Sequence, residues 1–220
     1  MLSKEQQLYN AAFYGELEKV KSLCSDPALN INWQHERRFT PLFGACEKGH
    51  FEVVKYLLSL KGIDPNKPEN TGATPFYIAC YNDHKDVVSL LLADPRIDPN
   101  KAKNNQTTPL WVASQNGHLV VVQHLLASER EIDTKMKSAY NNKTAAERAR
   151  AMGARAAKEA DETEEDFQRR KTNGPLCADL IDAYEEDPAK VRSQLRWQLG
   201  PPGNPSPYFF LFLKIIFALV

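Results

Sequence analysis

Three histidines recur at a fixed interval along the chain and are the first candidates for metal-binding chemistry. His50, His84 and His118 lie 34 residues apart, and imidazole is the commonest metal ligand among protein side chains. On successive packed units these side chains would form a row spaced by about 8 to 10 Å, the distance between packed helices. The ligands of one zinc ion all lie about 2 Å from the metal. We therefore predict no metal site and no cofactor, and assign the histidines a structural role.

The other reactive side chains also indicate structure rather than catalysis. The chain has four cysteines and no C-x-x-C pair, so we expect buried, reduced thiols rather than a zinc site or disulfides; they are Cys24, Cys46, Cys80 and Cys177. The acidic run at 161–166 is typical of a solvated surface. None of the common phosphate-binding, nucleophile-elbow or zinc-protease motifs occurs in the sequence. We predict no catalytic residue and a protein that is not an enzyme.

The histidines and two of the cysteines belong to a phrase that occurs three times. It reads TPLFGACEKGHFEVVKYLL from Thr40, TPFYIACYNDHKDVVSLLL from Thr74 and TPLWVASQNGHLVVVQHLL from Thr108. Proline suits the first turn of a helix, glycine ends one, and the paired valines and leucines fall on one face of a second helix. Weaker copies surround Ala11 and Ala149. Each unit is predicted to be helix, turn, helix and extended loop, and about five units form a solenoid.

The repeated phrase resembles the ankyrin repeat, whose consensus places T-P-L-H-x-A-A-x-x-G-H in the first helix and V-V-x-x-L-L in the second. The resemblance covers roughly Glu5 to Gly153. It implies an all-α ankyrin-repeat solenoid of stacked helix-turn-helix units with hairpin-like loops. Asp83 departs from the consensus because it replaces a glycine, although aspartate tolerates such turns better than most residues. Three aromatic residues stand where the consensus has histidine, namely Phe43, Tyr77 and Trp111. They either fill the space of that histidine or form an exposed ladder.

The chain divides into three parts. We expect a repeat array at 1–157, with units near 5–35, 36–69, 70–103, 104–138 and 139–157, then a helical extension at 158–200 and a Pro-rich loop and apolar tail at 201–220. In the extension we predict a charged helix from Arg155 to Lys171 that the sequence Asn173-Gly174-Pro175 breaks. Two short helices beginning at Pro175 and Pro188 would follow. They either cap the end of the stack or form a small docking module.

The last segment is unusually apolar. Residues 208–220 read YFFLFLKIIFALV and are apolar except for one lysine, which is shorter than the roughly 20 residues that a membrane-spanning helix needs. Three interpretations stay open: a terminal helix packed on the extension, an interfacial membrane contact, and a non-native end.

Charge and composition narrow the class of partner. Lysine plus arginine and aspartate plus glutamate each number 28, and zero net charge argues against a general nucleic-acid binder. The first residues contain no apolar run long enough for a signal peptide. We expect a cytoplasmic, monomeric protein.

The resemblance implies that a partner protein binds the concave face, where positions vary between repeats. On the first helices these positions are Phe13, Tyr14, Glu47, Lys48, Tyr81, Asn82, Gln115 and Asn116, and at the loop tips they are Glu36, Arg37, Phe39, Asn70, Thr71, Ala73, Asn104, Asn105 and Thr107. The loops contain the basic residues Arg37, Arg38, Lys67, Lys101 and Lys103. These residues either indicate an acidic partner or are simply solvated. We predict a protein-interaction scaffold; the alternative is an adaptor tethered to a membrane by the apolar tail.

Overall fold

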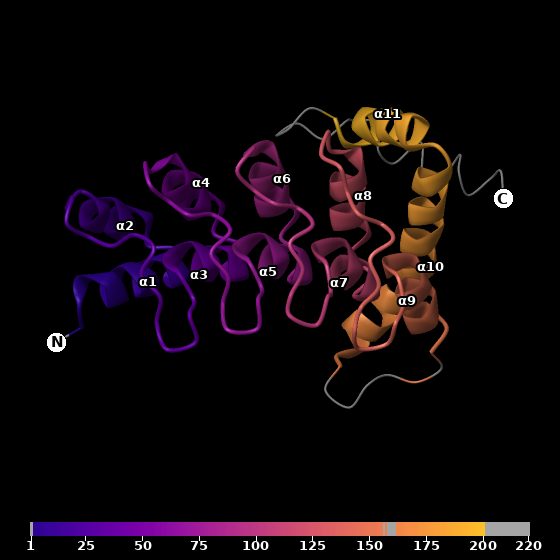
Figure 1. Ribbon diagram of the computed structural model, residues 1–220, viewed down its shortest axis with the longest axis horizontal. Coiled ribbons are helices and arrows are strands. Elements are labelled where there is room, and N and C mark those ends of the chain that lie inside the picture. Colours follow the sequence, from indigo (N-terminus) through magenta and orange to yellow (C-terminus); the bar gives the residue numbers. More distant parts are fainter. Residues whose placement is uncertain (1, 156, 158–161, 201–220) are drawn as a thin grey trace.

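The computed structural model describes residues 2–155, 157 and 162–200, and in this part the chain forms eleven α-helices and no strand. The predicted all-α solenoid is confirmed. One row contains the inner helices α1 (Lys4–Tyr14), α3 (Pro41–Lys48), α5 (Pro75–Tyr81), α7 (Pro109–Gln115) and α9 (Ala145–Gly153). The outer row contains α2 (Leu17–Cys24), α4 (Phe51–Ser59), α6 (Lys85–Ala93) and α8 (Leu119–Ala127). The two rows lie side by side along the length of the molecule (Figure 1).

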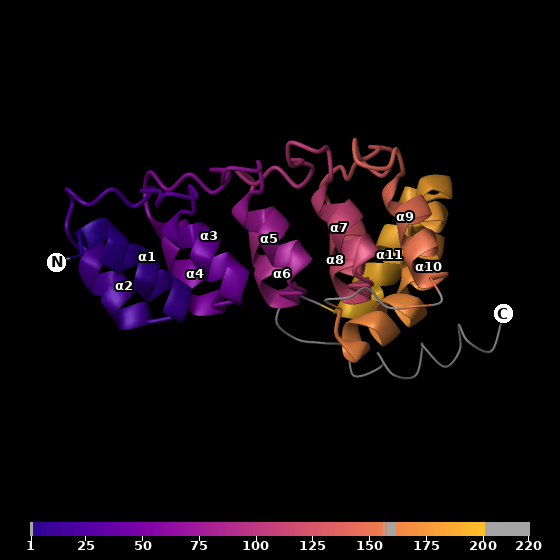
Figure 2. The same cartoon turned by 90° about the horizontal axis from the view of Figure 1, so that it is seen from below.

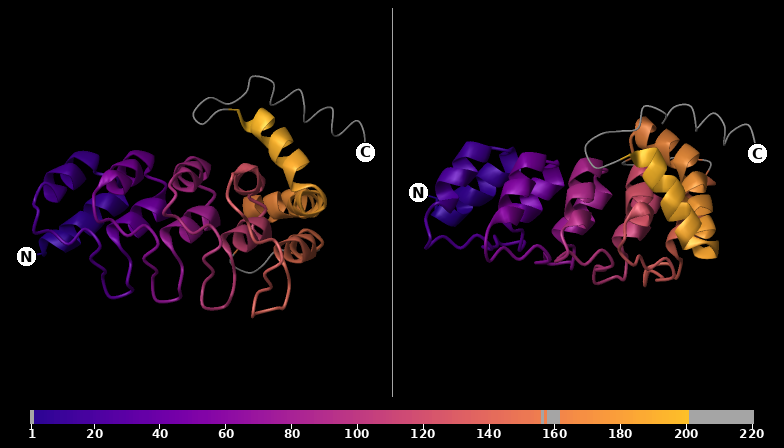
Figure 3. Two further views of the ribbon diagram at one scale, coloured as in Figure 1. Left: turned by 45° about the horizontal axis from the view of Figure 1, so that its top comes forward. Right: turned by 90° about the horizontal axis from the view of Figure 1, so that it is seen from above.

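Four long loops connect each outer helix to the next inner helix, and we call them fingers. They span residues 25–40, 60–74, 94–108 and 128–144 and project side by side from one edge of the stack (Figure 3). Each finger has a residue with a positive φ angle near its tip, namely Arg38, Gly72, Gln106 and Asn142. Only Gly72 adopts this left-handed conformation without a steric cost.

The repeated Thr-Pro pair starts the inner helices. The hydroxyl of Thr40 accepts a hydrogen bond from the backbone amide of Phe43 at 3.0 Å, and the same N-cap recurs in α5 and α7. Proline then occupies the first helical position, where a missing amide proton costs nothing. Asp83 takes the turn conformation that the glycines have, with a φ of 60° against 73° for Gly49, so the turn after α5 is kept.

The core lies between the helix pairs and between successive repeats. The paired valines and leucines of the outer helices are buried, for example Val53 and Leu57 at 2% and 0% exposure. The three aromatic residues that replace the consensus histidine are also buried. They fill space in the core and do not form an exposed ladder.

Asparagine side chains join each finger to the next. The amide of Asn66 donates to the carbonyl of Arg96 at 2.6 Å, and its oxygen accepts from the backbone amide of Asp98 at 3.0 Å. Asn32 and Asn100 make the same pair of bonds one period earlier and later. This asparagine ladder, formed by Asn32, Asn66 and Asn100, satisfies backbone groups that loops otherwise leave unpaired.

The extension differs from its prediction. Residues Glu164–Glu186 form one continuous helix, α10, and Pro188–Leu199 form α11, so the predicted break at Asn173-Gly174-Pro175 is wrong. Gly174 lies so close to α9 that a Cβ atom there would be 2.7 Å from the carbonyl oxygen of Ala149. This close contact between helices holds α10 together around Pro175, which a free helix tolerates poorly. The predicted helix beginning at Arg155 is also wrong, because α10 begins at Glu164 after the N-cap Thr163.

Helices α10 and α11 pack on the last repeat. Both contact α8, and α10 also lies along α9, as Figure 2 shows from below. Arg196 of α11 donates to the carbonyl oxygen of Ala127, the last residue of α8, and Arg192 donates to that of Arg130, shortly after α8. Buried apolar side chains of the extension are Cys177, Ile181, Tyr184, Val191 and Leu195. The extension therefore covers the end of the stack, as one of the two interpretations predicted.

The apolar tail, with its three interpretations, lies outside the described residues. None of the helices in the described part of the chain has the length and apolar character that a bilayer crossing requires.

Candidate functional site

The surface predicted to bind a partner is formed by the exposed sides of the inner helices and by the fingers, and we call it the inner face. The helices supply a rigid base, because each is capped and α3, α5 and α7 each pack between two neighbours of the row. The fingers extend from this base along one edge (Figures 1 and 3). The inner face is therefore one continuous surface built from several repeats.

The helix-end residues of the predicted site differ in exposure. Tyr14 and Tyr81 are 69% and 47% exposed, and Lys48 is exposed as well. Partly buried residues are Phe13, Glu47, Asn82, Gln115 and Asn116. The two tyrosines end α1 and α5 and are the largest apolar side chains that the inner helices present to solvent.

The finger residues of the predicted site lie mostly at the tips. Exposed tip residues are Glu36, Arg37, Asn70, Thr71, Asn104 and Asn105, and Phe39 is partly buried. Ala73 and Thr107 are buried at 5% and 3% exposure, and the Thr107 hydroxyl lies 3.2 Å from that of Tyr77. These two residues offer little surface to a partner.

The asparagines of the predicted site already have internal partners. The amide of Asn82 donates to the carbonyl of Glu47 at 3.0 Å, and that of Asn116 lies 3.4 Å from the carbonyl of Tyr81. At the tips, the amide of Asn104 reaches the carbonyl of Asn70 at 3.3 Å. These amides link successive repeats, so the aromatic and charged side chains are the main groups left for a partner.

Sequence reasoning missed an aromatic cluster at the first repeat. The rings of Tyr9, His35 and Phe39 form a series in which neighbouring centroids are 4.7 Å apart. Phe13 and Tyr14 extend it at one end, and Phe43 stacks on Phe39 at the other. One signal was present in the sequence, because Tyr9 lies one 34-residue period before Phe43.

Two features of α3 shape this aromatic cluster. Gly44 has no side chain, and a Cβ atom there would lie 3.2 Å from the Tyr9 ring, so the rings pack directly on the helix. The ammonium of Lys48 lies 4.6 Å from the centroid of the Phe13 ring, a cation–π contact. Burial, followed by the charge of Glu47, raises the pKa of Tyr9 to about 12. The Tyr9 phenol is therefore neutral at physiological pH.

The histidine row is structural, as predicted. Nε2 of His50 donates to the carbonyl of Phe13 at 3.0 Å, and that of His84 to the carbonyl of Glu47 at 2.9 Å, each one repeat earlier. The His84 ring fits against Gly49, where a Cβ atom would lie 2.6 Å from Nδ1. Among the residues that the structure describes, no three potential ligands lie close enough to hold a metal ion.

Three of the four cysteines are buried as predicted, and Cys24 is only partly buried. All four are free. Cys46 and Cys80 are fully buried, and burial raises the pKa of both thiols well above the usual value. Burial also raises the pKa of Cys177 to about 12 and that of the half-buried Cys24 to about 11. A nucleophilic cysteine needs a lowered pKa, so these thiols are unreactive.

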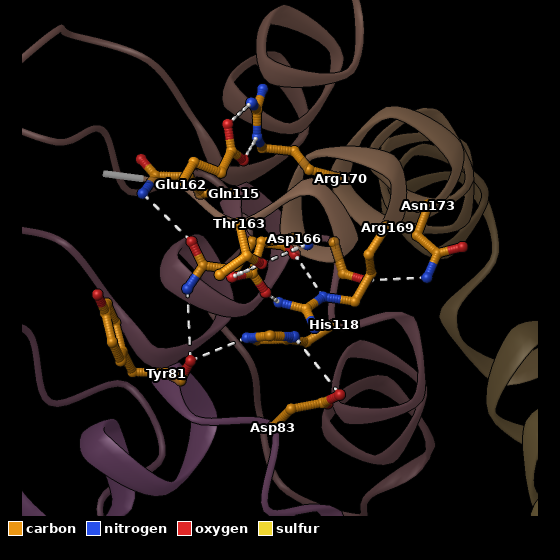
Figure 4. A network of polar contacts seen from close by, with 12 residues as sticks. Tyr81, Asp83, Gln115, His118, Glu162, Thr163, Asp166, Arg169, Arg170 and Asn173 are labelled. Carbon is orange, nitrogen blue, oxygen red and sulfur yellow. Dashed lines mark hydrogen bonds and ion pairs between the residues drawn. The ribbon is translucent and has the colours of Figure 1, made fainter. Parts of the chain in front are cut away.

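The third histidine lies in a polar network where α10 meets the stack (Figure 4). Nε2 of His118 donates to the carbonyl of Tyr81 at 2.8 Å, and Nδ1 lies 3.5 Å from a carboxylate oxygen of Asp83. Arg169 and Asn173 of α10 donate to the carbonyls of Asn116 and Gly117, at 3.3 and 3.0 Å. The start of α10 therefore covers the turn after α7, next to two residues of the predicted site.

Burial dominates the electrostatics of His118. Its side chain is 4% exposed, and this burial lowers the pKa of the imidazole below its usual value. Asp83 and Asp166 act in the opposite direction, and Arg169 adds to the lowering. His118 is thus held in its neutral form against the end of the inner face.

The geometry of stacked, capped helix pairs with joined fingers agrees with the comparison to known families. A family model described as ankyrin repeats (3 copies) matches two overlapping ranges, residues 8–103 and 60–138. This chain is an ankyrin-repeat protein. A search of curated proteins finds no match. Ankyrin repeats are in general protein–protein interaction modules and typically not enzymes.

The aromatic residues of this ankyrin-repeat chain have two different roles. Trp111 is 5% exposed and its indole nitrogen donates to the carbonyl of Lys143 at 3.0 Å, so it belongs to the ankyrin core. Tyr81 is exposed on the inner face. Of the two, only Tyr81 can contact a partner without a change in the fold.

Proposed function

We propose that this ankyrin-repeat protein is a non-enzymatic scaffold that binds another protein through its inner face. The observation that carries the proposal is the position of the exposed tyrosines. Tyr14 and Tyr81 end inner helices and Tyr140 lies on the last finger, with exposures of 69%, 47% and 78%. Within the described residues, no outer helix has a large apolar side chain of comparable exposure.

The mechanism is rigid presentation of these side chains. Exposed tyrosine is frequent at the energetic centre of interfaces because it combines a large ring with a hydrogen-bonding group. The tyrosines of the inner helices stand on capped helices: α5 packs between α3 and α7, and α1, the first of the row, packs on α3 and α2. Little conformational entropy is then lost on binding, which favours affinity. We further propose that a single chain acts in the cytoplasm, where four free thiols are usual.

Site-specific photocrosslinking tests the proposal. A photoreactive phenylalanine analogue at position 81 should crosslink to partner proteins in an extract of the source cells. The matched control places the same analogue at position 55, because Lys55 is exposed on the outer helix α4. Crosslinks from position 55 that equal those from position 81 would contradict binding at the inner face.

A further inference from the structure

The complete fingers contain eleven basic and nine acidic residues, and their positive charge is concentrated at the tips. The segments 35–38, 67–73, 101–107 and 135–143 contain the basic residues Arg37, Arg38, Lys67, Lys101, Lys103, Lys135, Lys137 and Lys143. The same segments contain only two acidic residues, Glu36 and Glu69. The total charge of the chain is zero, and acidic residues nearer the bases of the fingers, such as Asp64 and Asp98, offset part of the positive charge at the tips.

Half of these eight basic groups are available for a partner. Arg37, Arg38, Lys101 and Lys137 are exposed, and none of them forms an ion pair with a described residue. A row of unpaired positive charges attracts an acidic segment and raises its association rate.

Arg38 supplies a second, independent observation. Its φ angle is 61°, at the position where the next finger has Gly72. A side chain in this left-handed conformation is sterically unfavourable, and a glycine would relieve the strain. Gln106 and Asn142 have the same conformation at the matching positions of the third and fourth fingers, so three of the four tips retain a side chain there despite the strain, and of these three only Arg38 is charged. Here that side chain is a guanidinium, which binds carboxylates with two parallel hydrogen bonds.

The aromatic cluster borders the same charges. Phe39 follows Arg38 directly, and its ring stacks on that of Phe43 at 4.5 Å between centroids. Tyr9, Phe13 and Phe39 are all only partly buried, so an apolar side chain has ring surface to pack on. Within the cluster, Lys48 lies over Phe13 and 3.9 Å from Glu47. The first repeat thus places apolar ring surface beside the cations of the first fingertip.

The chain itself contains one example of the interaction. Lys135 of the last finger forms an ion pair with Glu185 of the acidic helix α10. An acidic segment therefore already lies against a finger lysine at one end of the row.

We propose that the partner of the inner face is an acidic protein segment with an apolar anchor. Its carboxylates bind the finger cations, led by Arg37 and Arg38, and the anchor packs on the rings of Tyr9, Phe13 and Phe39. This inference rests on the proposed function and adds the chemistry of the partner. Protein rather than nucleic acid is favoured because the net charge is zero and α10 is acidic.

Fluorescence polarisation with defined probes tests this. The probe is a fluorescein-labelled peptide in which glutamates flank a central phenylalanine, and the comparison peptide has glutamine at every glutamate. We expect the acidic peptide to bind at least about tenfold more tightly, with affinity falling as salt screens the charges. Equal affinities of the two peptides would overturn the proposal, and so would tighter binding of a single-stranded RNA of equal charge.

Two variants locate the site. The double change Arg37→Glu and Arg38→Glu should weaken binding of the acidic peptide about tenfold or more. The matched control, Lys55→Glu with Lys61→Glu, makes the same change of charge away from the fingertips and should leave binding unchanged. Equal effects of both double variants would contradict the proposal. So would a salt-sensitive dimer that the arginine variant abolishes, because the occupant would then be the acidic α10 of a second copy.

The change Arg38→Gly excludes unfolding as an explanation. Glycine suits the φ angle of this position, so the variant should unfold at a higher temperature while binding the acidic peptide several-fold more weakly. Unchanged binding by this stabilised variant would show that the guanidinium is not used. If crosslinking at position 81 continues while these peptide results are negative, the scaffold function stands and only the acidic partner is rejected.

Discussion

Gly174 of α10 lies against Ala149 of α9 so closely that a methyl group at position 174 would be 2.7 Å from the Ala149 carbonyl oxygen. Gly153 faces the same crossing, where a methyl group would lie 2.7 Å from the ring of Pro175. The two glycines allow the backbones of α9 and α10 to approach, and this contact attaches the extension to the repeats.

Gly174→Ala should therefore destabilise the protein, although alanine normally stabilises a helix interior by about 0.5 to 1 kcal/mol relative to glycine. The overpacked contact should cost about 1 to 3 kcal/mol of unfolding free energy, measured by urea denaturation. Thr172→Ala, at an exposed position of the same helix, is the control and should be neutral or slightly stabilising. A stabilised Gly174→Ala variant would disprove the close crossing.

Trp111→Ala and Tyr81→Ala should separate folding from binding. Trp111 is buried and hydrogen-bonded, so its truncation should cost about 3 to 5 kcal/mol of unfolding free energy. Tyr81 is about half exposed, and its truncation should change stability by only about 0.5 kcal/mol. Thermal denaturation measures the first effect and partner crosslinking the second. Similar losses of stability in both variants would be inconsistent with the assigned roles.

The asparagine ladder predicts a difference between two asparagines. Asn66 donates to one backbone group of the next finger and accepts from another, so Asn66→Ala should lower the unfolding free energy by about 1 to 3 kcal/mol. The side chain of Asn104, at an exposed tip, makes one long hydrogen bond of 3.3 Å. Asn104→Ala should therefore lower the unfolding free energy by about 0.5 kcal/mol or less. Equal destabilisation of both variants would mean that the ladder adds nothing beyond an ordinary surface contact.

Stability should fall as the pH is lowered through the range of histidine titration. Burial lowers the folded-state pKa of His118 and of His124 below the usual value of about 6.5. The unfolded chain then takes up protons at a higher pH than the folded chain, so unfolding becomes more favourable as the pH falls below about 6.5. For His118 the nearby charges are Asp83, Asp166 and Arg169, and for His124 they are Asp86 and Lys85.

Urea denaturation across this pH range measures the effect. The variants His118→Gln and His124→Gln should each lose part of the pH dependence between about pH 7 and 5, above the range where most carboxylates titrate. If the double variant keeps the full dependence of the natural chain, the two histidines are not its source.

The repeats could be predicted because their determinants are local and recur. Thr40, Pro41 and Gly49 define one inner helix in the sequence as they do in the structure, and two further copies confirmed the period. The continuity of α10 could not be predicted in this way. Asn173-Gly174-Pro175 is a helix-breaking sequence when taken alone, and only the contact with α9, which depends on folding, overrides it.

The candidate site could also be predicted only in outline, because part of it depends on contacts that form on folding. The variable positions include exposed residues at helix ends and fingertips, such as Tyr14, Tyr81 and Arg37, and their role in binding stays a prediction. Burial removed Ala73 and Thr107 from the surface. Tyr9 and His35 were missed because their rings meet across an inner helix and a finger, a contact that no local pattern records.

The asparagine ladder also determines how the array tolerates changes in length. Removal of residues 74–107 would bring Asn66 to the carbonyl of Glu131 and the amide of Asp133, which are the groups that Asn100 binds in this chain. Every backbone bond of the ladder would then be restored across the new junction. A change in length by whole repeats would therefore leave none of the ladder's backbone groups unpaired.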